Sequence, residues 1–214
     1  MLPKGLQGAG GAMALLPLLW GSSSGQSHTI GVFFDDRAQV CVAEVLNFAP
    51  AIRAYVFAMV PDGTLLNGAL LSIDVPAGFV ISDERPPHSG IGHIDGTLTG
   101  SNGLSVILQN CFLAAGPVEL VSFDLKQVDR NLPEDFRVPD VRLEIKGASV
   151  PADSLVFEKP QVKICDPIDP INGKPLLVEA IPIVSTMNCT ADCPCTTPVT
   201  PTTWGRVKCL FRGP

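Results

Sequence analysis

Histidine, tyrosine and tryptophan are scarce in this chain, at three, one and two residues among 214. Basic side chains are also few, with 15 lysines and arginines against 21 acidic residues and a net charge of −6. Nucleic-acid backbones are bound by clustered lysine and arginine, so this balance argues against a nucleic-acid partner. A flat carbohydrate platform needs exposed tryptophan or tyrosine, and too few are present to build one. The ten phenylalanines are most simply assigned to the core.

Motifs of common enzymes are absent as well. The chain has no His-Glu-x-x-His, and Gly-x-Ser-x-Gly occurs only within the first 26 residues. The glycines between Gly90 and Gly96 are wrongly spaced for a phosphate loop and precede no helical pattern, so they predict a turn and a strand. The sequence therefore predicts a protein that is not an enzyme and that holds no cofactor. A secreted hydrolase built on Asp35, His93 and Asp95 is the distant alternative.

No apolar run is long enough to cross a bilayer, which needs about 20 residues. The apolar run at residues 12–20 follows a single positive charge at Lys4 and precedes the small residues 21–25. These are the three parts of a secretory signal, so we predict a signal peptide over residues 1–26, cleaved between Ser24 and Gln26. A disordered leader is the alternative. The mature chain is predicted to have no transmembrane segment and to be secreted, extracellular or part of the cell envelope.

Seven cysteines follow the leader and none lies inside it: Cys41, Cys111, Cys165, Cys189, Cys193, Cys195 and Cys209. Because exported proteins keep cysteines as disulfides, we predict that they staple the domain and its tail, with one thiol left over. The connectivity stays open. The alternative is a metal site at Cys189-x3-Cys193-x-Cys195 with Cys209, although that spacing differs from standard zinc knuckles.

Apolar and polar residues alternate with a period of two from about residue 28 to residue 186, and no segment has the helical period. Strands are expected at 28–34, 39–45, 51–60, 69–75, 93–99, 104–110, 118–128, 141–146, 161–165 and 176–184. The segment 51–60 is apolar on both faces, which predicts a central strand. Residues 82–91 are expected to form a polar loop, and 101–103 the turn of a hairpin. The pattern predicts an all-β fold, an antiparallel Ig-like or cohesin-like β-sandwich of about nine strands.

The composition changes near residue 188, where a stretch rich in Cys, Thr and Pro begins. We predict a β-sandwich domain over 27–187, a linker over 188–202 and a C-terminal amphipathic segment over 203–214. For so short a segment, a turn of helix and a last strand are equal alternatives. As a turn of helix, the segment places four apolar residues on one face: Trp204, Val207, Leu210 and Phe211. They are predicted either to pack back on the sandwich and cover an edge, or to dock on a partner or a sorting system. The linker opens with Asn188-Cys189-Thr190, which matches an N-glycan acceptor with cysteine in a poor position.

Two groups of polar residues are weak candidates for a metal site. His88, His93 and Asp95 are close in sequence, and the last two share one strand face. Asp166 and Asp169, with the nearby Asn172, could offer oxygens to calcium, but calcium takes six to eight. A solvated strand face and an ordinary polar turn are the simpler interpretations, and no metal is predicted.

Several short motifs resemble a loose group of uncharacterised secreted bacterial proteins. They are Gly31-Val32-Phe33-Phe34-Asp35-Asp36 with Cys41 after it, Ala54-Tyr55-Val56, and Asn67-Gly68-Ala69 followed by Val75-Pro76-Ala77-Gly78-Phe79. The stretch from Thr203 to Arg212 resembles the terminal Trp-Gly-x-x-Lys-x-Leu-Phe/Tyr-Arg segment of that group. The strand pattern is also similar to cohesin and carbohydrate-module sandwiches, a likeness of fold that transfers no binding residues.

Together these observations predict a non-catalytic structural or adhesion module of the cell surface or the extracellular space. A glycan- or protein-binding module of cohesin-like design is the alternative, with a protein or a glycan at the cell surface as its partner. The sequence fixes neither the ligand nor the oligomeric state.

Overall fold

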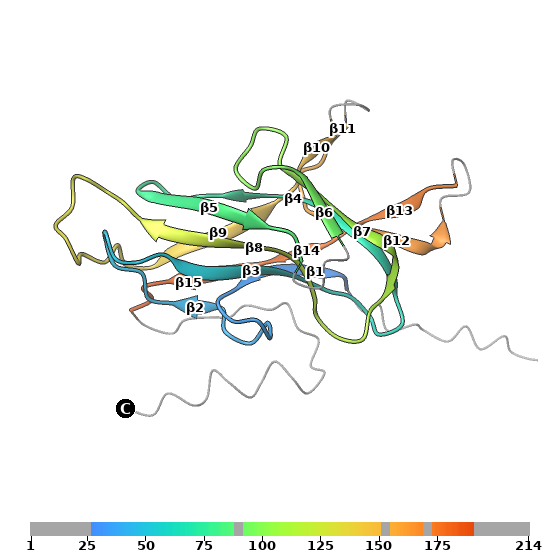
Figure 1. The fold of residues 1–214 in the computed structure, drawn as a ribbon, viewed down its shortest axis with the longest axis horizontal. Coiled ribbons are helices and arrows are strands. Elements are labelled where there is room, and N and C mark those ends of the chain that lie inside the picture. The colour runs from blue at the N-terminus through green and yellow to red at the C-terminus, as the bar shows by residue number, and fades with distance from the viewer. Residues whose placement is uncertain (1–26, 88–91, 151–154, 169–172, 191–214) are drawn as a thin grey trace, which may run out of the picture.

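The computed structural model describes residues 27–87, 92–150, 155–168 and 173–190, and every regular element in these ranges is a β-strand (Figure 1). The strands are β1 (Thr29–Phe33), β2 (Val42–Ala43), β3 (Ile52–Met59), β4 (Leu65–Asp74), β5 (Phe79–Arg85), β6 (Gly92–Gly96), β7 (Leu104–Leu113), β8 (Val118–Gln127), β9 (Val141–Lys146), β10 (Ser149–Val150), β11 (Leu155–Val156), β12 (Gln161–Ile168), β13 (Pro175–Glu179), β14 (Ile181–Ile183) and β15 (Ser185–Met187). The described residues contain no helix long and apolar enough to span a membrane.

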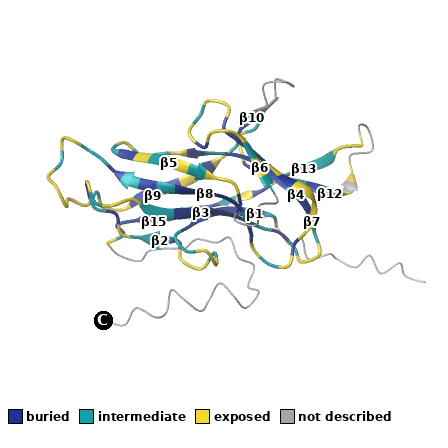
Figure 2. Ribbon diagram, viewed as in Figure 1, coloured by how far each residue is buried: buried dark blue, intermediate teal, exposed yellow. Residues whose placement is uncertain are grey.

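Two mixed sheets form the sandwich, as the alternation predicted for an all-β fold. One sheet has the order β14-β1-β3-β8-β5. The other has the order β13-β12-β4-β9-β15-β2, and β7 pairs with β4 while β6 pairs with β7. Strands β10 and β11 form a small separate hairpin. Most buried apolar residues of both sheets belong to one cluster, which runs along β1, β3 and β8 on one side (Figure 2).

Strand β3 is the central strand predicted for segment 51–60, because it pairs with β1 on one side and with β8 on the other. Its inward residues Ala54, Val56 and Ala58 are completely buried. On its outward face, Phe57 is only 4% exposed and packs edge-on against Phe33, with ring centres 5.9 Å apart. Both faces of this strand are therefore covered from Val56 to Ala58, as its composition indicated, while Tyr55 nearer its start is half-buried.

A second, small apolar cluster lies on the outward face of β1 and β3, outside the sandwich core. It contains Phe33, Cys41, Phe57 and Ile183. Gly31 makes this packing feasible, because a Cβ there would lie 2.8 Å from the Cβ of Ile183 and 2.9 Å from the ring of Phe33. The cluster packs Cys41, which lies just before β2, against β1, β3 and β14 of the first sheet.

Two strand pairs are parallel, although the sequence predicted an antiparallel sandwich. The late strands return beside the early ones, so β14 pairs with β1 and β15 pairs with β2. Strand β2 contains only Val42–Ala43, shorter than the strand expected at 39–45, because the residues before it form a turn. The predicted hairpin about residues 101–103 is confirmed by the antiparallel pairing of β6 with β7.

The polar loop predicted at 82–91 is wrong at its start, because β5 extends to Arg85 and pairs with β8. This edge strand has a charged outer face with no apolar alternation to reveal it. The Asp83 carboxylate, at a residue with φ of 53°, forms ion pairs with Arg53 at 3.1 Å and with Arg85. The carboxylate of Glu84 accepts the backbone N–H of Leu98 at 3.0 and 3.1 Å. Side-chain pairing thus holds an edge that hydrophobic pattern alone does not predict.

Candidate functional site

The predicted pair His93 and Asp95 lies exposed on β6, at the edge of the second sheet. Asp95 is opposite Ser105 and His93 is opposite Ile107 of β7. His88, the third residue of this group, lies outside the described residues. The structure therefore brings His93 and Asp95 to one sheet face, beside residues of β7 that the sequence analysis did not connect with them.

Lys163 of β12 completes this face from the far side of β4. Gly68 of β4 is opposite Ile107 on one side and Lys163 on the other, so no side chain separates them. The Lys163 ammonium crosses this gap and donates a hydrogen bond to Ser105 Oγ at 2.9 Å. Burial lowers the pKa of Lys163, and the charge of Asp95 partly opposes that shift.

We name these residues the β6–β12 face: His93, Asp95, Ser105, Ile107 and Lys163. They point away from the core, because the intervening row of Val106, Ala69 and Val162 is completely buried. Ile107 is 36% exposed and has charged or polar neighbours on several sides. Lys163 and Ser105 are half-buried on this outward side of the strands, beside the exposed residues His93, Asp95 and Ile107.

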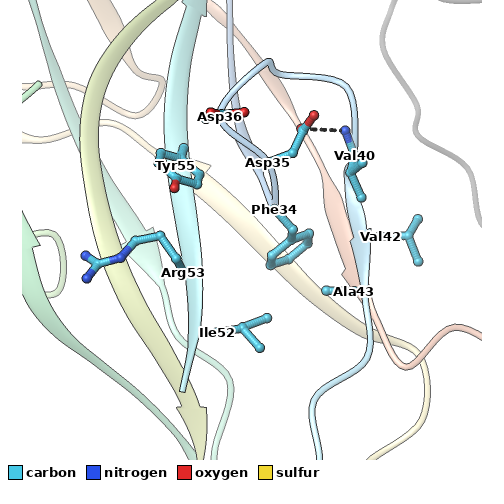
Figure 3. A pocket seen from close by; sticks show the side chains of 9 residues that line it. All are labelled: Phe34, Asp35, Asp36, Val40, Val42, Ala43, Ile52, Arg53 and Tyr55. Atoms are coloured by element: carbon cyan, nitrogen blue, oxygen red, sulfur yellow. Dashed lines mark hydrogen bonds between the residues drawn. The ribbon is translucent and has the colours of Figure 1, made fainter. Parts of the chain in front are cut away.

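A hollow of about 590 Å³ lies on the first sheet, between the segment after β1 and the start of β3 (Figure 3). It is lined by Phe34, Asp35, Asp36, Val40, Val42, Ala43, Ile52, Arg53 and Tyr55. None of these comes from β6, so Asp35 belongs to a different site from His93 and Asp95. The three residues of the hydrolase alternative are therefore not brought together in one pocket.

Asp35 shapes the wall of this hollow. Its Oδ1 atom accepts the backbone N–H groups of Gln39 and Val40, each at 2.7 Å. The carboxylate thereby closes the turn that leads into β2, a common role for aspartate. Arg53, on the opposite wall, forms ion pairs with Asp83 and Asp124 at 3.1 Å. Asp35 and Arg53 are thus held by structural contacts.

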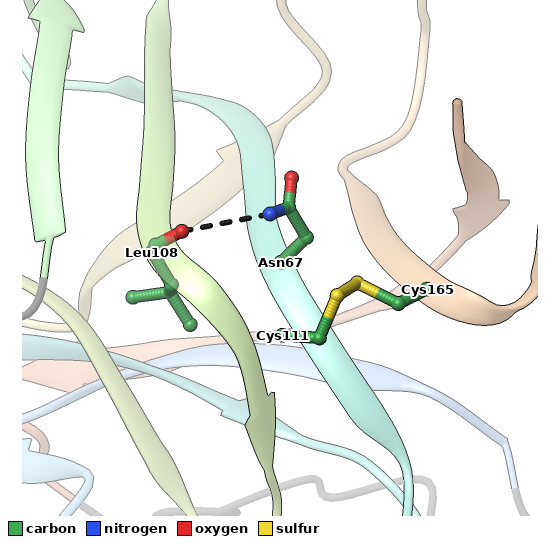
Figure 4. The surroundings of a disulfide bond; sticks show 4 residues. All are labelled: Asn67, Leu108, Cys111 and Cys165. Carbon is green, nitrogen blue, oxygen red and sulfur yellow. Dashed lines mark hydrogen bonds between the residues drawn. A yellow bond between two sulfur atoms is a disulfide. The ribbon is translucent and has the colours of Figure 1, made fainter. Parts of the chain in front are cut away.

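Cys111 and Cys165 form a disulfide within the domain, with Cα atoms 6.1 Å apart (Figure 4). This bond agrees with the prediction that the cysteines form disulfides. Four residues of β7, 108–111, face a single residue of β4 between the pairs Gly68–Ile107 and Leu66–Phe112. The extra residues carry the disulfide across β4, so it joins two strands that do not pair with each other. Cys41 and Cys189 are also disulfide-bonded.

Asn188, the first residue of the glycan-acceptor pattern, is 5% exposed and has no room for a sugar. Its amide oxygen accepts Val45 N–H at 2.7 Å, and its amide nitrogen donates to the carbonyls of Val45 and Val138 at 2.8 and 2.9 Å. The nitrogen that a glycan would occupy is therefore fully used inside the fold. The pattern marks a structural clamp between β15, the chain after β2 and the chain before β9.

The assignment of all phenylalanines to the core is wrong for three of them. Phe48, Phe112 and Phe136 are 44, 37 and 41% exposed. Phe48 follows Asn47, which is fully buried and whose side chain hydrogen-bonds to the backbone of Asp129, Leu132 and Pro133. These contacts hold Phe48 at a φ of 56°, a strained value for an aromatic residue. Sequence pattern could not reveal this, because Phe48 sits within an apolar stretch.

The described residues contain no group of three or more His, Cys, Asp and Glu side chains close enough to hold a metal ion. Asp166 is exposed, while its proposed calcium partners Asp169 and Asn172 lie outside the described residues. Also outside them lie Cys193, Cys195 and Cys209 of the alternative metal cluster, and the apolar tail residues Trp204, Val207, Leu210 and Phe211. The calcium hypothesis and the docking of the tail therefore stay predictions, whereas the disulfide bond of Cys189 removes it as a thiolate ligand of the alternative metal cluster.

No protein-family model and no curated protein matches the chain. Among solved structures, the non-cellulosomal cohesin of the archaeon Archaeoglobus fulgidus is similar over 77% of this chain and 92% of its own, at 15% identity and a TM-score of 0.41. The seventh ScaB type I cohesin of Pseudobacteroides cellulosolvens is similar over 78% of this chain and 95% of its own, at 8% identity and a TM-score of 0.45. BcpA, the major pilin subunit of Bacillus cereus, is similar over 77% of this chain and 41% of its own, at 8% identity and a TM-score of 0.43.

The structural similarity to these cohesin domains is at 8–15% sequence identity and TM-scores below 0.5, and it assigns no binding residues to this chain. The resemblance to secreted bacterial proteins with a terminal Trp-Gly segment stays a prediction.

Proposed function

We propose that this protein is a non-catalytic, exported adhesion module that binds a protein partner at the cell surface or in the extracellular space. The 1–26 leader, the 27–187 domain, the 188–202 linker and the 203–214 segment are parts of the same proposal. The observation that carries it is the β6–β12 face, where a half-exposed apolar residue is surrounded by polar and charged side chains on a rigid sheet. An apolar centre with a polar rim is the usual composition of a protein interface.

The scaffold behind this face supports the proposal. The disulfide between Cys111 and Cys165 fixes β7 to β12, the two strands that supply Ile107 and Lys163. Because Lys163 is held by Ser105 at 2.9 Å, its ammonium is ordered before any partner arrives. Preorganised side chains lose little entropy on binding, which favours a specific contact.

A glycan partner is the second candidate and has less support. Sugar rings stack on tryptophan and tyrosine, and the β6–β12 face contains neither. A hydrolase is the third candidate. Its candidate residues are Asp35, His93 and Asp95, and Asp35 lines a hollow to which β6 contributes no residue.

The test measures retention of the purified, oxidised protein on envelopes of cells that export it. Ile107→Asp is expected to lower the retained fraction about tenfold, which corresponds to a loss of roughly 1.4 kcal/mol in binding free energy. A residue at the centre of an interface contributes at least this much. Val80→Asp is the matched control, because Val80 is 47% exposed on β5 of the other sheet. Protease treatment of the envelopes should abolish retention, and periodate oxidation of glycans should not. Equal retention of the Ile107 variant and wild type would refute the role of this face.

A further inference from the structure

The hollow on the first sheet has mostly apolar walls and three charged lining residues, Asp35, Asp36 and Arg53, of which Arg53 is paired with Asp83 and Asp124. Val40 is 43% exposed, and Phe34, Ile52 and Tyr55 are half-buried around the same space (Figure 3). The adjacent Asp35 and Asp36 supply negative charge, and Asp36 lies 4.0 Å from the exposed Arg37. Such a surface suits a short apolar segment that carries positive charge.

The C-terminal part of the chain reaches one wall of this hollow. Strand β15 runs parallel to β2, with Thr186 opposite Val42 and Met187 opposite Ala43. The next residue, Asn188, donates its backbone N–H to the carbonyl of Ala43 at 2.8 Å. Val42 and Ala43 both line the hollow, and the described chain ends two residues after Asn188, at Thr190, whose N–H and hydroxyl bond to the Asp140 carboxylate.

A covalent bond ties the same region to a later stretch of the chain, residues 189–209. Cys41 is disulfide-bonded and lies between Val40 and Val42, two residues of the hollow. Because Cys111 is paired with Cys165, the partner of Cys41 within this chain is one of the remaining four cysteines. All four belong to the stretch 189–209. Whichever of them is used, the bond tethers that stretch next to the hollow.

The segment that follows matches the hollow in chemistry. Residues 203–214 contain Trp204, Val207, Leu210 and Phe211 together with three basic and no acidic side chains. Apolar contact with the walls and attraction between the basic side chains and the carboxylates of Asp35 and Asp36 act in the same direction.

We propose that residues 203–214 of the same chain occupy the hollow lined by Phe34, Val40, Val42 and Tyr55, with the disulfide of Cys41 as their tether. The segment covers the outward face of β1 and β3 beside the small cluster of Phe33 and Phe57. It is thus a built-in strap on the sheet opposite the β6–β12 face, and it does not depend on the partner proposed for that face.

Tryptophan fluorescence of the full oxidised chain tests this proposal. Substitution of Trp20 by phenylalanine leaves Trp204 as the sole tryptophan, whether or not the leader is removed. Docking is expected to shift the emission of Trp204 to shorter wavelength and to lower its quenching by acrylamide severalfold relative to the urea-unfolded protein. Added salt should raise the quenching, because it screens the attraction to Asp35 and Asp36.

Variants of the hollow decide where the indole lies. Val40→Ser and Asp36→Lys are expected to raise the quenching of Trp204, whereas their controls Val156→Ser and Asp62→Lys should leave it unchanged. Val156 is 79% exposed and Asp62 is in a turn, and neither lines the hollow. Quenching in the parent protein equal to that in urea would overturn the proposal. Low quenching of Trp204 that the hollow variants leave unchanged would also overturn the proposal. Low quenching that is lost on dilution of the protein would place the segment on a second copy and would overturn it as well.

Discussion

Replacing Asn188 by alanine should destabilise the sandwich strongly, although the residue looks like a surface linker position in the sequence. The substitution removes three hydrogen bonds of 2.7, 2.8 and 2.9 Å and leaves the N–H and C=O of Val45 and the carbonyl of Val138 without this partner. At about 1 kcal/mol for each bond, the expected loss is about 3 kcal/mol. For a domain of this size, that loss lowers the melting temperature by about 6–12 °C.

Urea unfolding of the oxidised protein, followed by circular dichroism, measures this loss. Asn188→Asp is expected to lose at least as much at neutral pH, because a carboxylate oxygen would face the two carbonyls that the amide nitrogen now serves. The control is Asn131→Ala at an exposed loop position, where a change within about 0.5 kcal/mol is expected. A loss below about 1 kcal/mol for Asn188→Ala would show that the amide does not clamp the chain segments.

Three further changes follow from the contacts. Replacing both Cys111 and Cys165 by serine should lower the free energy of unfolding by about 4 kcal/mol, because the disulfide closes a loop with a sequence separation of 54 residues. Urea unfolding without reductant measures this loss, and an unchanged midpoint would contradict the argument from loop closure. Because burial lowers the pKa of Lys163, the folded state binds fewer protons, and stability should rise with pH between that lowered pKa and 10.5. Lys163→Met should abolish this rise in pH-dependent unfolding. Gln127 is completely buried with both amide atoms unpaired among the described residues, so Gln127→Met should raise the unfolding free energy by about 1 kcal/mol; a loss would refute this.

Most of the fold could be predicted because one face of each central strand is buried. Val141, Leu143 and Ile145 are 8, 0 and 1% exposed, and the charged residues between them are exposed, as strict alternation requires. Strand β5 could not be predicted in the same way, because its side chains from residue 82 onward are polar and its pairing depends on ion pairs with Arg53. The parallel returns of β14 and β15 were equally hidden, since parallel contacts between distant segments leave no local signature.

The disulfide shows why cysteine spacing alone gave no connectivity. Cys111 and Cys165 lie on strands that both neighbour β4, and two such strands normally stand too far apart for a disulfide. The excess residues of β7 opposite Asn67 bring the two sulfur atoms together. A register irregularity of this kind depends on tertiary pairing, so only the structure reveals that these two cysteines are partners.

The sites predicted from the sequence consist of residues that are close along the chain, and several of these residues have architectural roles in the structure. Asp35 closes a turn, and Asn188, the first residue of the glycan-acceptor pattern, joins three segments of the chain. The β6–β12 face is instead built by residues up to 70 positions apart, from His93 to Lys163, which meet because Gly68 leaves space between their strands. Period-two alternation indicates which residues of a strand point outward, but it carries no information on which strands are neighbours. In a sandwich, a binding surface is a property of strand order and register, so short motifs are poor guides to it.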